Sequence, residues 1–399
     1  MRKCLIIWIH LILILTITIS QGQSREKPLS IFGYFQNSFF HETGYTHWIE
    51  SQSAYNSFNL QQLNLFLQKD ISSGWRAFVD FQFLNTFSSA RRWGSFNIEE
   101  AWIRYRLNEK FTLKLGLQIP IFNHLNEIKN RTPLLPYVVR PLVYETSFSE
   151  FIAVDEYTPT SAFVQAYGFI LLKNIKLDYA AYVGNSPNIS WQDPNRQFES
   201  QQTGIDTTDT ILLGGRVGIR IGEFKAGLSS TIDYVNFFEG ARDFIDAPPS
   251  RFSEIPRIRF GGDLSYHIWK LSLWAELIKL TYDDDIPNVS INKFFYYATM
   301  AYRIGDDALV YINYMKTEED ITELTVSGEG DPTSFQLIQL LTGRQNVHVP
   351  SCGFSYTLFD RLAFKAQFAP VKLKGNVETL DLEFDINFNY YALAISVFF

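Results

Sequence analysis

Charged side chains recur at alternate positions within segments that are otherwise apolar. In residues 75–83, Arg76 and Asp80 alternate with large apolar residues, so an extended chain would carry its charges on one face only. Fixed charges that face a water-filled interior attract ions of the opposite sign, so these residues indicate ion selectivity rather than catalysis. The principal charges predicted on this inward face are Arg76, Asp80, Glu100, Arg104, Arg106, Lys114, Arg216, Arg220, Arg259 and Asp263.

The predicted inward face is more basic than acidic. Together with ten further charged residues, named at the end of this paragraph, this face holds fourteen basic and six acidic side chains, although the whole chain has a net charge of −7. This excess predicts a preference for anions, because a charged, low-dielectric passage concentrates the opposite ion. The alternative is that many of these charges pair with one another along the wall or are merely solvated near the periplasmic mouth. The remaining members are Lys176, Lys225, Arg257, Lys270, Arg303, Arg361, Lys365, Asp178, Asp233 and Glu276.

The long segment 120–160 is the second candidate for function. It contains five of the fifteen prolines, which fix φ and stiffen the backbone, and irregular connections of this length are usually functional. We expect it to fold inward as a constriction that sets acidic groups opposite the basic wall. The alternative is a loop over the outer mouth or against a neighbouring subunit. Its charged residues are Arg131, Arg140, Glu145, Glu150, Asp155 and Glu156, together with Glu127 and Lys129.

Sixteen segments with this two-residue alternation are predicted to be β-strands. Their connections alternate between short ones and long ones, the latter including 318–345 and 370–387. Such a pattern is typical of bacterial outer-membrane barrels. The predicted fold is an all-β, transmembrane antiparallel β-barrel of about 16 strands, with short periplasmic turns and long extracellular loops. The strands are expected near 30–40, 58–69, 74–84, 96–107, 111–119, 161–171, 174–184, 210–221, 223–236, 257–268, 269–281, 292–304, 307–317, 346–358, 360–369 and 388–399.

The composition agrees with a membrane barrel better than with a water-soluble β-sandwich, which is the alternative fold. No apolar run beyond the N-terminus reaches the ~20 residues of a membrane helix. The acidic balance argues against a nucleic-acid binder, and two cysteines are too few for a disulfide scaffold. Several aromatic residues lie on the apolar face beside short turns, where barrels place an interfacial girdle. These are Trp75, Tyr105, Phe111, Phe224, Tyr266, Tyr302, Tyr356 and Phe399.

Both ends of the chain carry targeting signals. Two basic residues, an apolar stretch and small residues at positions 20 and 22 predict a secretory signal peptide over 1–22, rather than a retained anchor helix. Residues 23–399 are then expected to form the barrel in the bacterial outer membrane, with Cys352 as the single cysteine. At the other end, the apolar face of the last predicted strand is expected to be recognised by the barrel-assembly machinery. This face consists of Leu393, Ile395, Val397 and Phe399.

The mature chain resembles Gram-negative porins with sixteen strands. Two adjacent segments, Asn97–Ile103 and Leu113–Pro120, are similar to a strand pair of the phosphate-selective porin O and P group. The resemblance implies passive diffusion of small hydrophilic or anionic solutes without a cofactor. It also implies a surrounding of outer-membrane lipid and lipopolysaccharide, and it allows a homotrimer.

The sequence therefore predicts a porin and not an enzyme. The histidines show no metal-binding spacing, and no nucleophile and base could be combined into a catalytic set. Two alternatives remain open: a structural or adhesive barrel plugged by residues 120–160, and, ranked below it, an outer-membrane hydrolase. Single-channel conductance tests the first alternative, and assays of lipid or peptide cleavage test the second.

Replacing Phe399 with Ala is expected to lower the amount of protein inserted in the outer membrane, because the terminal aromatic group of the recognition face is lost. Quantitative immunoblotting of outer-membrane fractions measures this. Normal levels of the Phe399→Ala variant would show that the C-terminal strand is not read in this way.

Overall fold

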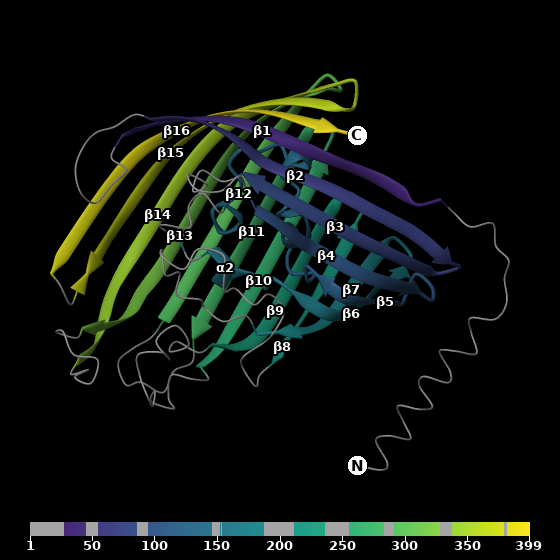
Figure 1. Cartoon of the computed structure of the whole chain (residues 1–399), viewed down its shortest axis with the longest axis horizontal. Coiled ribbons are helices and arrows are strands. Elements are labelled where there is room, and N and C mark those ends of the chain that lie inside the picture. Colours follow the sequence, from purple (N-terminus) through teal and green to yellow (C-terminus); the bar gives the residue numbers. More distant parts are fainter. Residues whose placement is uncertain are drawn as a thin grey trace, which may run out of the picture.

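Sixteen antiparallel strands form one closed barrel in the computed structural model (Figure 1). The structure describes residues 28–44, 55–85, 95–145, 152, 154–186, 211–235, 255–282, 291–327, 337–378 and 381–399. The predicted fold is confirmed, while the predicted signal peptide lies outside the described residues. The strands are β1 (Ser30–Gly44), β2 (Tyr55–Ser72), β3 (Trp75–Asn85), β4 (Ser95–Arg106), β5 (Thr112–Gln118), β6 (Ala162–Leu172), β7 (Ile175–Asn185), β8 (Ile211–Ile221), β9 (Phe224–Val235), β10 (Ile255–Ile268), β11 (Leu271–Tyr282), β12 (Ile291–Ile304), β13 (Ala308–Ser327), β14 (Leu337–Leu358), β15 (Leu362–Val377) and β16 (Leu382–Phe398).

The barrel closes where β1 pairs with β16, and these two strands lie side by side in Figure 1. Beyond the regular ladder, Gly33 N donates to Phe399 O at 2.9 Å and Phe399 N donates to Gly33 O at 3.0 Å. Closure is required in a bilayer because hydrocarbon offers no partner for the amides of an open sheet edge. The last residue of the chain therefore takes part in the seam.

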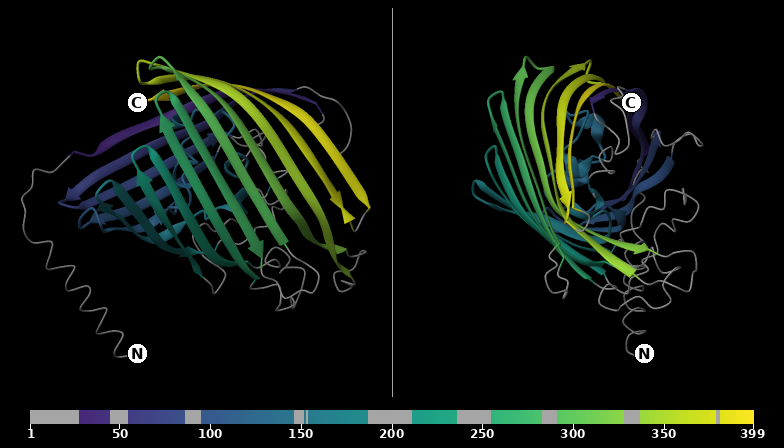
Figure 2. Two further views of the ribbon diagram at one scale, coloured as in Figure 1. Left: turned by 180° about the vertical axis from the view of Figure 1, so that it is seen from behind. Right: turned by 90° about the vertical axis from the view of Figure 1, so that its left-hand side faces the viewer.

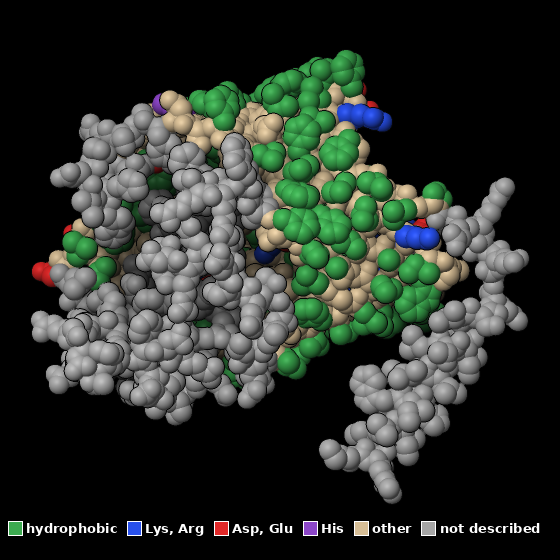
Figure 3. Space-filling view, in the orientation of Figure 1, with side chains coloured by type: hydrophobic (Ala, Val, Ile, Leu, Met, Phe, Trp, Pro, Cys, Tyr) green, Lys and Arg blue, Asp and Glu red, His purple; other side chains and the backbone are tan. Residues whose placement is uncertain are grey.

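The outer surface of the barrel is apolar, as the alternation predicts. Figure 3 shows hydrophobic side chains covering the outward face of the strands nearest the viewer. Two predicted girdle pairs are cross-strand neighbours: the rings of Trp75 and Tyr105 are 4.7 Å apart, and those of Phe224 and Tyr266 are 6.4 Å apart. No helix among the described residues is both long and apolar enough to span a bilayer.

The predicted loops 318–345 and 370–387 are wrong in extent, because four strands continue into them. The pair β13 and β14 extends to Ser327 and from Leu337, and β15 and β16 leave only residues 378–381 between them. In these extensions the polarity of the two faces is reversed. Val371 and Leu373 are buried inside the barrel, whereas Lys372 and Lys374 point outward and are exposed. A strand with this pattern stands in water beyond the membrane, not in lipid.

The connection between β5 and β6, residues 119–161, is called the third loop below. It contains the short helices η2 (Asn126–Ile128), η3 (Thr132–Leu134), η4 (Leu142–Tyr144) and α2 (Val154–Tyr157). Figure 2 shows this segment, in blue and teal, inside the barrel. Its apolar residues and inward side chains of β11–β16 form the largest hydrophobic cluster of the described residues.

Gly33 leaves no room for a side chain at the seam. A Cβ atom there would lie 2.3 Å from Asn64 O and 2.8 Å from the Phe399 ring, whereas a Cβ at Gly262 would be 3.4 Å from its nearest neighbour in Leu277. Gly33→Ala is therefore expected to destabilise the closed barrel by about 1–3 kcal/mol, and Gly262→Ala to leave it unchanged. The temperature at which the folded band disappears on detergent gels measures both, and equal temperatures for the two variants would contradict this account of closure.

Candidate functional site

The third loop contacts inward side chains around most of the barrel. Its backbone amides donate to Gln165 on β6 at 3.0 Å and to Gln62 on β2 at 3.1 Å. On the opposite side, the amides of Val138 and Val139 both donate to the Gln367 amide oxygen on β15, at 2.9 and 2.8 Å. The described residues of the loop thus lie across the lumen rather than over its mouth, as expected for the inward fold of 120–160.

The loop covers one side of the lumen through apolar packing. We call the inward face of β11–β16 the apolar wall, because its buried side chains are mostly hydrophobic. The ring of Tyr137 meets that of Tyr311 edge-on at 5.3 Å, and Tyr144 and Tyr157 meet Phe295 at 6.4 and 6.3 Å. The wall residues of this cluster are Ile278, Phe295, Tyr297, Ala301, Tyr311, Met315, Val347, Val349, Ala369, Val371, Leu373, Ile386, Phe388, Tyr390, Ala392 and Ala394.

Two buried polar side chains of the wall hold the middle of the loop. Glu276 accepts hydrogen bonds from the backbone amides of His124 and Leu125, at 3.0 and 2.7 Å, and from the Tyr144 hydroxyl at 2.7 Å. The Lys365 ammonium donates to the carbonyl oxygens of Thr132 and Pro133, at 2.8 and 3.1 Å. Since a buried charge without partners is very costly, these bonds fix the path of the loop.

The C-terminal part of the loop is anchored by an ion pair. The Glu156 carboxylate lies 2.6 Å from Lys293 Nζ and accepts a hydrogen bond from the Tyr282 hydroxyl at 2.7 Å. Arg259 Nε donates to the Glu156 carbonyl oxygen at 2.6 Å. Burial alone would raise the pKa of Glu156, but the charge and hydrogen bonds of Lys293 more than offset it, so this pKa lies below the ordinary value. The anchor therefore persists through neutral and mildly acidic pH.

The opposite side of the lumen, the inward face of β3–β9, is here called the basic wall. Strand register places its cations in two rows: Arg76, Arg104 and Lys114 are direct neighbours on β3–β5, and Lys176, Arg220 and Lys225 are direct neighbours on β7–β9. Like charges directly opposite each other are destabilising. In the first row Arg76 and Lys114 have carboxylate neighbours in Asp70 and Glu100, whereas the cations of the second row have none within ion-pair distance among the described residues.

Part of the basic wall is neutralised by its own carboxylates. Arg216 donates to Asp178 at 2.6 Å and to Asp263 at 2.8 and 3.0 Å. A Cβ at Gly227 would lie 2.1 Å from this guanidinium, and one at Gly218 would lie 2.5 Å from Asp178 and 2.8 Å from Arg216, so both glycines leave room for the pair. The pairing that was the alternative interpretation of the inward charges holds for this arginine.

Other predicted pore-lining residues are also paired. Arg76 is 2.6 Å from Asp70, and Arg259, which is fully buried beneath the loop, is 2.9 Å from Asp233. Asp80 accepts a hydrogen bond from Asn64 at 2.7 Å. Arg106 is 3.9 Å from Glu109.

In the described part of the chain, Arg104, Lys176, Arg220 and Lys225 have no carboxylate within ion-pair distance. Arg104 hydrogen-bonds to Tyr167, Arg220 donates to the Gly222 carbonyl at 3.2 Å, and Lys176 lies over the Phe169 ring. These four cations are partly or fully exposed to the lumen.

The loop charges divide between anchors and the lumen. Arg131 lies 3.3 Å from Glu100, which is also 3.8 Å from Lys114, while Arg140 and Glu145 form a buried pair within the loop. Glu150 lies outside the described residues, as does the side chain of Asp155.

One acidic group of the loop faces the basic wall. Burial raises the pKa of Glu127, and the nearby charge of Lys114 partly offsets that shift. Of the other loop carboxylates that the structure describes, Glu145 pairs with Arg140 and Glu156 with Lys293, so neither faces the basic wall as expected.

Several inward charges and one polar pair were not predicted from the sequence, among them Glu42 and Asp70 on the first two strands. A bulge in β4 places Glu99 beside Glu100, and Glu99 accepts a hydrogen bond from Asn130 of the loop. Lys293 shares the parity of Arg303 and was therefore detectable, whereas Glu319 lies in the strand extension that was taken for a loop.

A serine and a histidine also meet. His267 Nδ1 lies 2.8 Å from Ser272 Oγ, and among the described residues no carboxylate hydrogen-bonds to this ring. The described residues contain no group of His, Cys, Asp and Glu side chains suited to a metal ion.

No protein-family model matches the chain, and no curated protein is similar to it in sequence. Solved structures are similar in fold. The anion-selective porin from Comamonas acidovorans has a TM-score of 0.57 at 12% identity, covering 93% of this chain and 99% of that one. The outer membrane channel DcaP of Acinetobacter baumannii has a TM-score of 0.52 at 11% identity, covering 95% and 99%. The trimer form of OmpT, an outer membrane protein of Vibrio cholerae, has a TM-score of 0.52 at 9% identity, covering 94% and 100%.

Breaking the Glu156 anchor is expected to release the third loop. Glu156→Gln leaves Lys293 buried with a weaker partner, and removing one member of a buried pair costs about 3–5 kcal/mol. Trypsin should then cleave the folded barrel after Lys129 or Arg131 faster than in the wild type. Asp385→Asn is the matched control, because it breaks an exposed pair with Lys374. The wild-type protein should stay resistant to trypsin at pH 5, since the pKa of Glu156 is lowered and its carboxylate stays ionised. Equal cleavage rates for Glu156→Gln and Asp385→Asn would show that Glu156 does not hold the loop in place.

Proposed function

We propose that this protein is an outer-membrane porin through which small hydrophilic solutes diffuse passively, with a preference for anions. The observation that carries the proposal is the asymmetry of the lumen. The third loop packs on the apolar wall, and the basic wall opposite keeps partly or fully exposed cations without carboxylate partners, namely Arg104, Lys176, Arg220 and Lys225. Fixed charges along a narrow passage raise the local concentration of counter-ions and set selectivity.

The paired and unpaired charges have different roles in this proposal. Arg216 and Arg259 hold carboxylates of the wall and contribute little net charge to the passage. The row Lys176, Arg220 and Lys225 carries three positive charges on adjacent strands. Selectivity is therefore assigned to this row and to Arg104, a smaller set than the fourteen basic residues counted in the sequence.

The remaining assignments follow from the same proposal. The location is the bacterial outer membrane after cleavage of residues 1–22, the partners are lipid, lipopolysaccharide and the barrel-assembly machinery, and the protein is not an enzyme. A homotrimer is proposed because the OmpT structure of similar fold is a trimer form. The local similarity of 97–103 and 113–120 to phosphate-selective porins stays a prediction.

A second candidate is a closed structural barrel. It is favoured by the reach of the third loop, which bonds to Gln62 and Gln165 on one side and to Gln367 and Glu276 on the other. Planar-bilayer recording separates the candidates, because a barrel closed by its loop gives no conductance steps.

Replacing Lys176, Arg220 and Lys225 together with Gln is expected to shift the permeability ratio toward cations. The shift should be largest at low salt, since the Debye length is about 30 Å at 0.01 M and about 3 Å at 1 M. Reversal potentials across a salt gradient in planar bilayers measure it.

The matched control replaces Lys279, Lys316 and Lys372 with Gln. It removes the same number of charges from the outer surface, where these lysines face away from the lumen. Equal reversal potentials for the wild type and both triple variants at low salt would rule out the basic row as the source of selectivity.

A further inference from the structure

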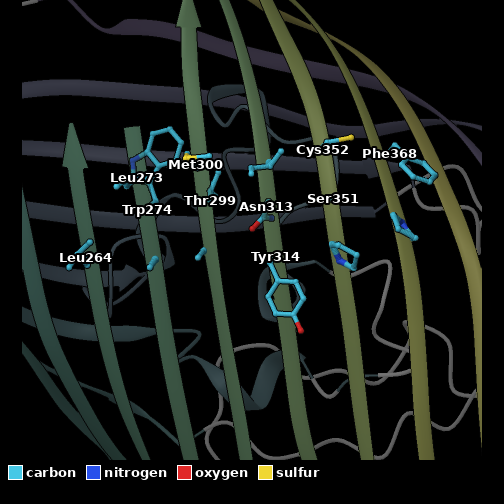
Figure 4. A pocket seen from close by; sticks show the side chains of 15 residues that line it. Leu264, Leu273, Trp274, Thr299, Met300, Asn313, Tyr314, Ser351, Cys352 and Phe368 are labelled. Atoms are coloured by element: carbon cyan, nitrogen blue, oxygen red, sulfur yellow. The ribbon is translucent and has the colours of Figure 1, made fainter. Parts of the chain in front are cut away.

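The outward face of β10–β15 is hollowed. A groove of about 750 Å³ lies on it, and the side chains that line it are shown in Figure 4. Ala275 and Ala298 are cross-strand partners and form a shallow floor, while Met300, Ile312 and Tyr314 rise beside it. The surface that the groove exposes is almost entirely apolar, and its outward side chains, such as Leu273, Met300 and Phe368, face away from the lumen, whereas buried Thr299, Asn313 and Ser351 point inward. The groove therefore belongs to the lipid side of the barrel and not to the solute path.

Two prolines explain why the sheet is hollowed there. Pro350 on β14 and Pro370 on β15 both line the groove, and neither has a backbone N–H to contribute to the ladder. The register between these strands stops at the pair His348–Lys372 and resumes only at Cys352–Phe368. The groove is thus built into the sheet rather than left by one flexible side chain.

Polar and basic residues border one end of the groove only. Tyr296, Lys316, His348 and Lys372 are successive neighbours in one row across β12–β15, directly beyond Tyr314, Pro350 and Pro370. The Tyr314 hydroxyl and His348 Nδ1 are 2.9 Å apart. This row is where the strand polarity reverses, so it marks the level of the lipid headgroups on the loop side of the barrel.

Three acidic groups at or near this level have cationic partners, whereas the exposed Glu383, in the same row as Asp320, has none within ion-pair distance among the described residues. Glu318 pairs with Lys316, Asp320 is 3.6 Å from Arg344, and Asp385 is 2.8 Å from Lys374.

Lys279 on β11 and Lys372 on β15 have no such partner among the described residues, and both are exposed. They stand four strands apart, about 19 Å at ~4.8 Å per strand, on either side of the groove. Lys279 also borders a second, polar hollow of about 390 Å³. Glu318 and Asp320 line the same hollow but pair with Lys316 and Arg344, so the charges of Lys279 and Lys372 stay available to an anionic headgroup.

We propose that this groove binds one phosphorylated, acylated lipid of the outer leaflet, of the lipid A type found in lipopolysaccharide. Acyl chains lie over Ala275 and Ala298, and the phosphates meet Lys279 and Lys372. The inference rests on the proposed membrane location and goes beyond it, since it assigns a lipid class to one face of the barrel. The apolar hollow and the headgroup cations are separate observations that point to the same amphiphile.

The test measures lipid retained by the purified full-length protein after release from detergent, by native mass spectrometry. Bisphosphorylated lipid A and phosphatidylethanolamine are added in parallel. The wild type should retain one lipid A and prefer it to the zwitterionic lipid. Lys279→Glu with Lys372→Glu should weaken retention of lipid A at least about 25-fold, since each surface lysine beside an anionic headgroup contributes about fivefold.

A second variant tests the hollow itself. Ala298→Phe fills the floor without changing charge and should also lower retention. The controls are Lys110→Glu with Lys270→Glu at turns of the opposite rim, and Ala181→Phe on the outward face of β7, where the residue is exposed to lipid. Retention at the wild-type level in both groove variants, or equal retention of the two lipids, would overturn the proposal.

Conductance recorded on the same preparations separates this inference from the proposed function. Conductance steps without selective lipid A retention would overturn only the lipid site. Selective retention that the groove variants abolish would support the site even if the barrel gave no steps.

Discussion

The structure depends on one constraint, which is that hydrocarbon offers no hydrogen-bond partners to a backbone. The sheet must therefore close, and it does so through β1 and β16, with the Phe399 amide and carbonyl paired to Gly33. Closure fixes which side chains face the lumen, because neighbouring residues alternate between the two faces of every strand. The charges of the lumen, the packing of the third loop and the apolar outer surface all follow from this alternation.

The lumen is divided because its two sides differ in chemistry. The apolar wall buries the hydrophobic residues of the third loop, so the loop needs few charges to stay in place, and those it uses are fully engaged: Glu156 with Lys293, and Glu276 with the amides of residues 124 and 125. The loop covers the basic wall only in part, through polar contacts such as Arg131 with Glu100 and the Ile121 amide with Gln165. The cations of this wall are either held by carboxylates, as Arg216 is, or left facing the passage, as Lys225 is.

Period-two alternation was sufficient to predict sixteen strands and to assign Arg216, Arg220 and Lys365 to the inward face. It could not predict which charges pair, because pairing depends on neighbours brought together by register: Asp178 and Asp263 are distant in sequence and meet only at Arg216. The prediction also assumed that each strand keeps its apolar residues on the same face along its whole length. In the extension of β15 the apolar residues face the barrel interior and Lys372 and Lys374 face outward, so the sequence of this segment looked like that of a loop. The bulge that turns Glu99 inward breaks the alternation, so the inward position of Glu99 could not be predicted from the sequence pattern.

The central claim is that the third loop narrows the lumen without closing it. Single-channel recording of the wild-type protein in planar bilayers, with a salt gradient across the membrane, tests this most directly. The account predicts discrete conductance steps and a reversal potential displaced toward the equilibrium potential of the anion. A folded, heat-modifiable protein that inserts into the bilayer and gives no steps would contradict it and would establish the loop as a plug.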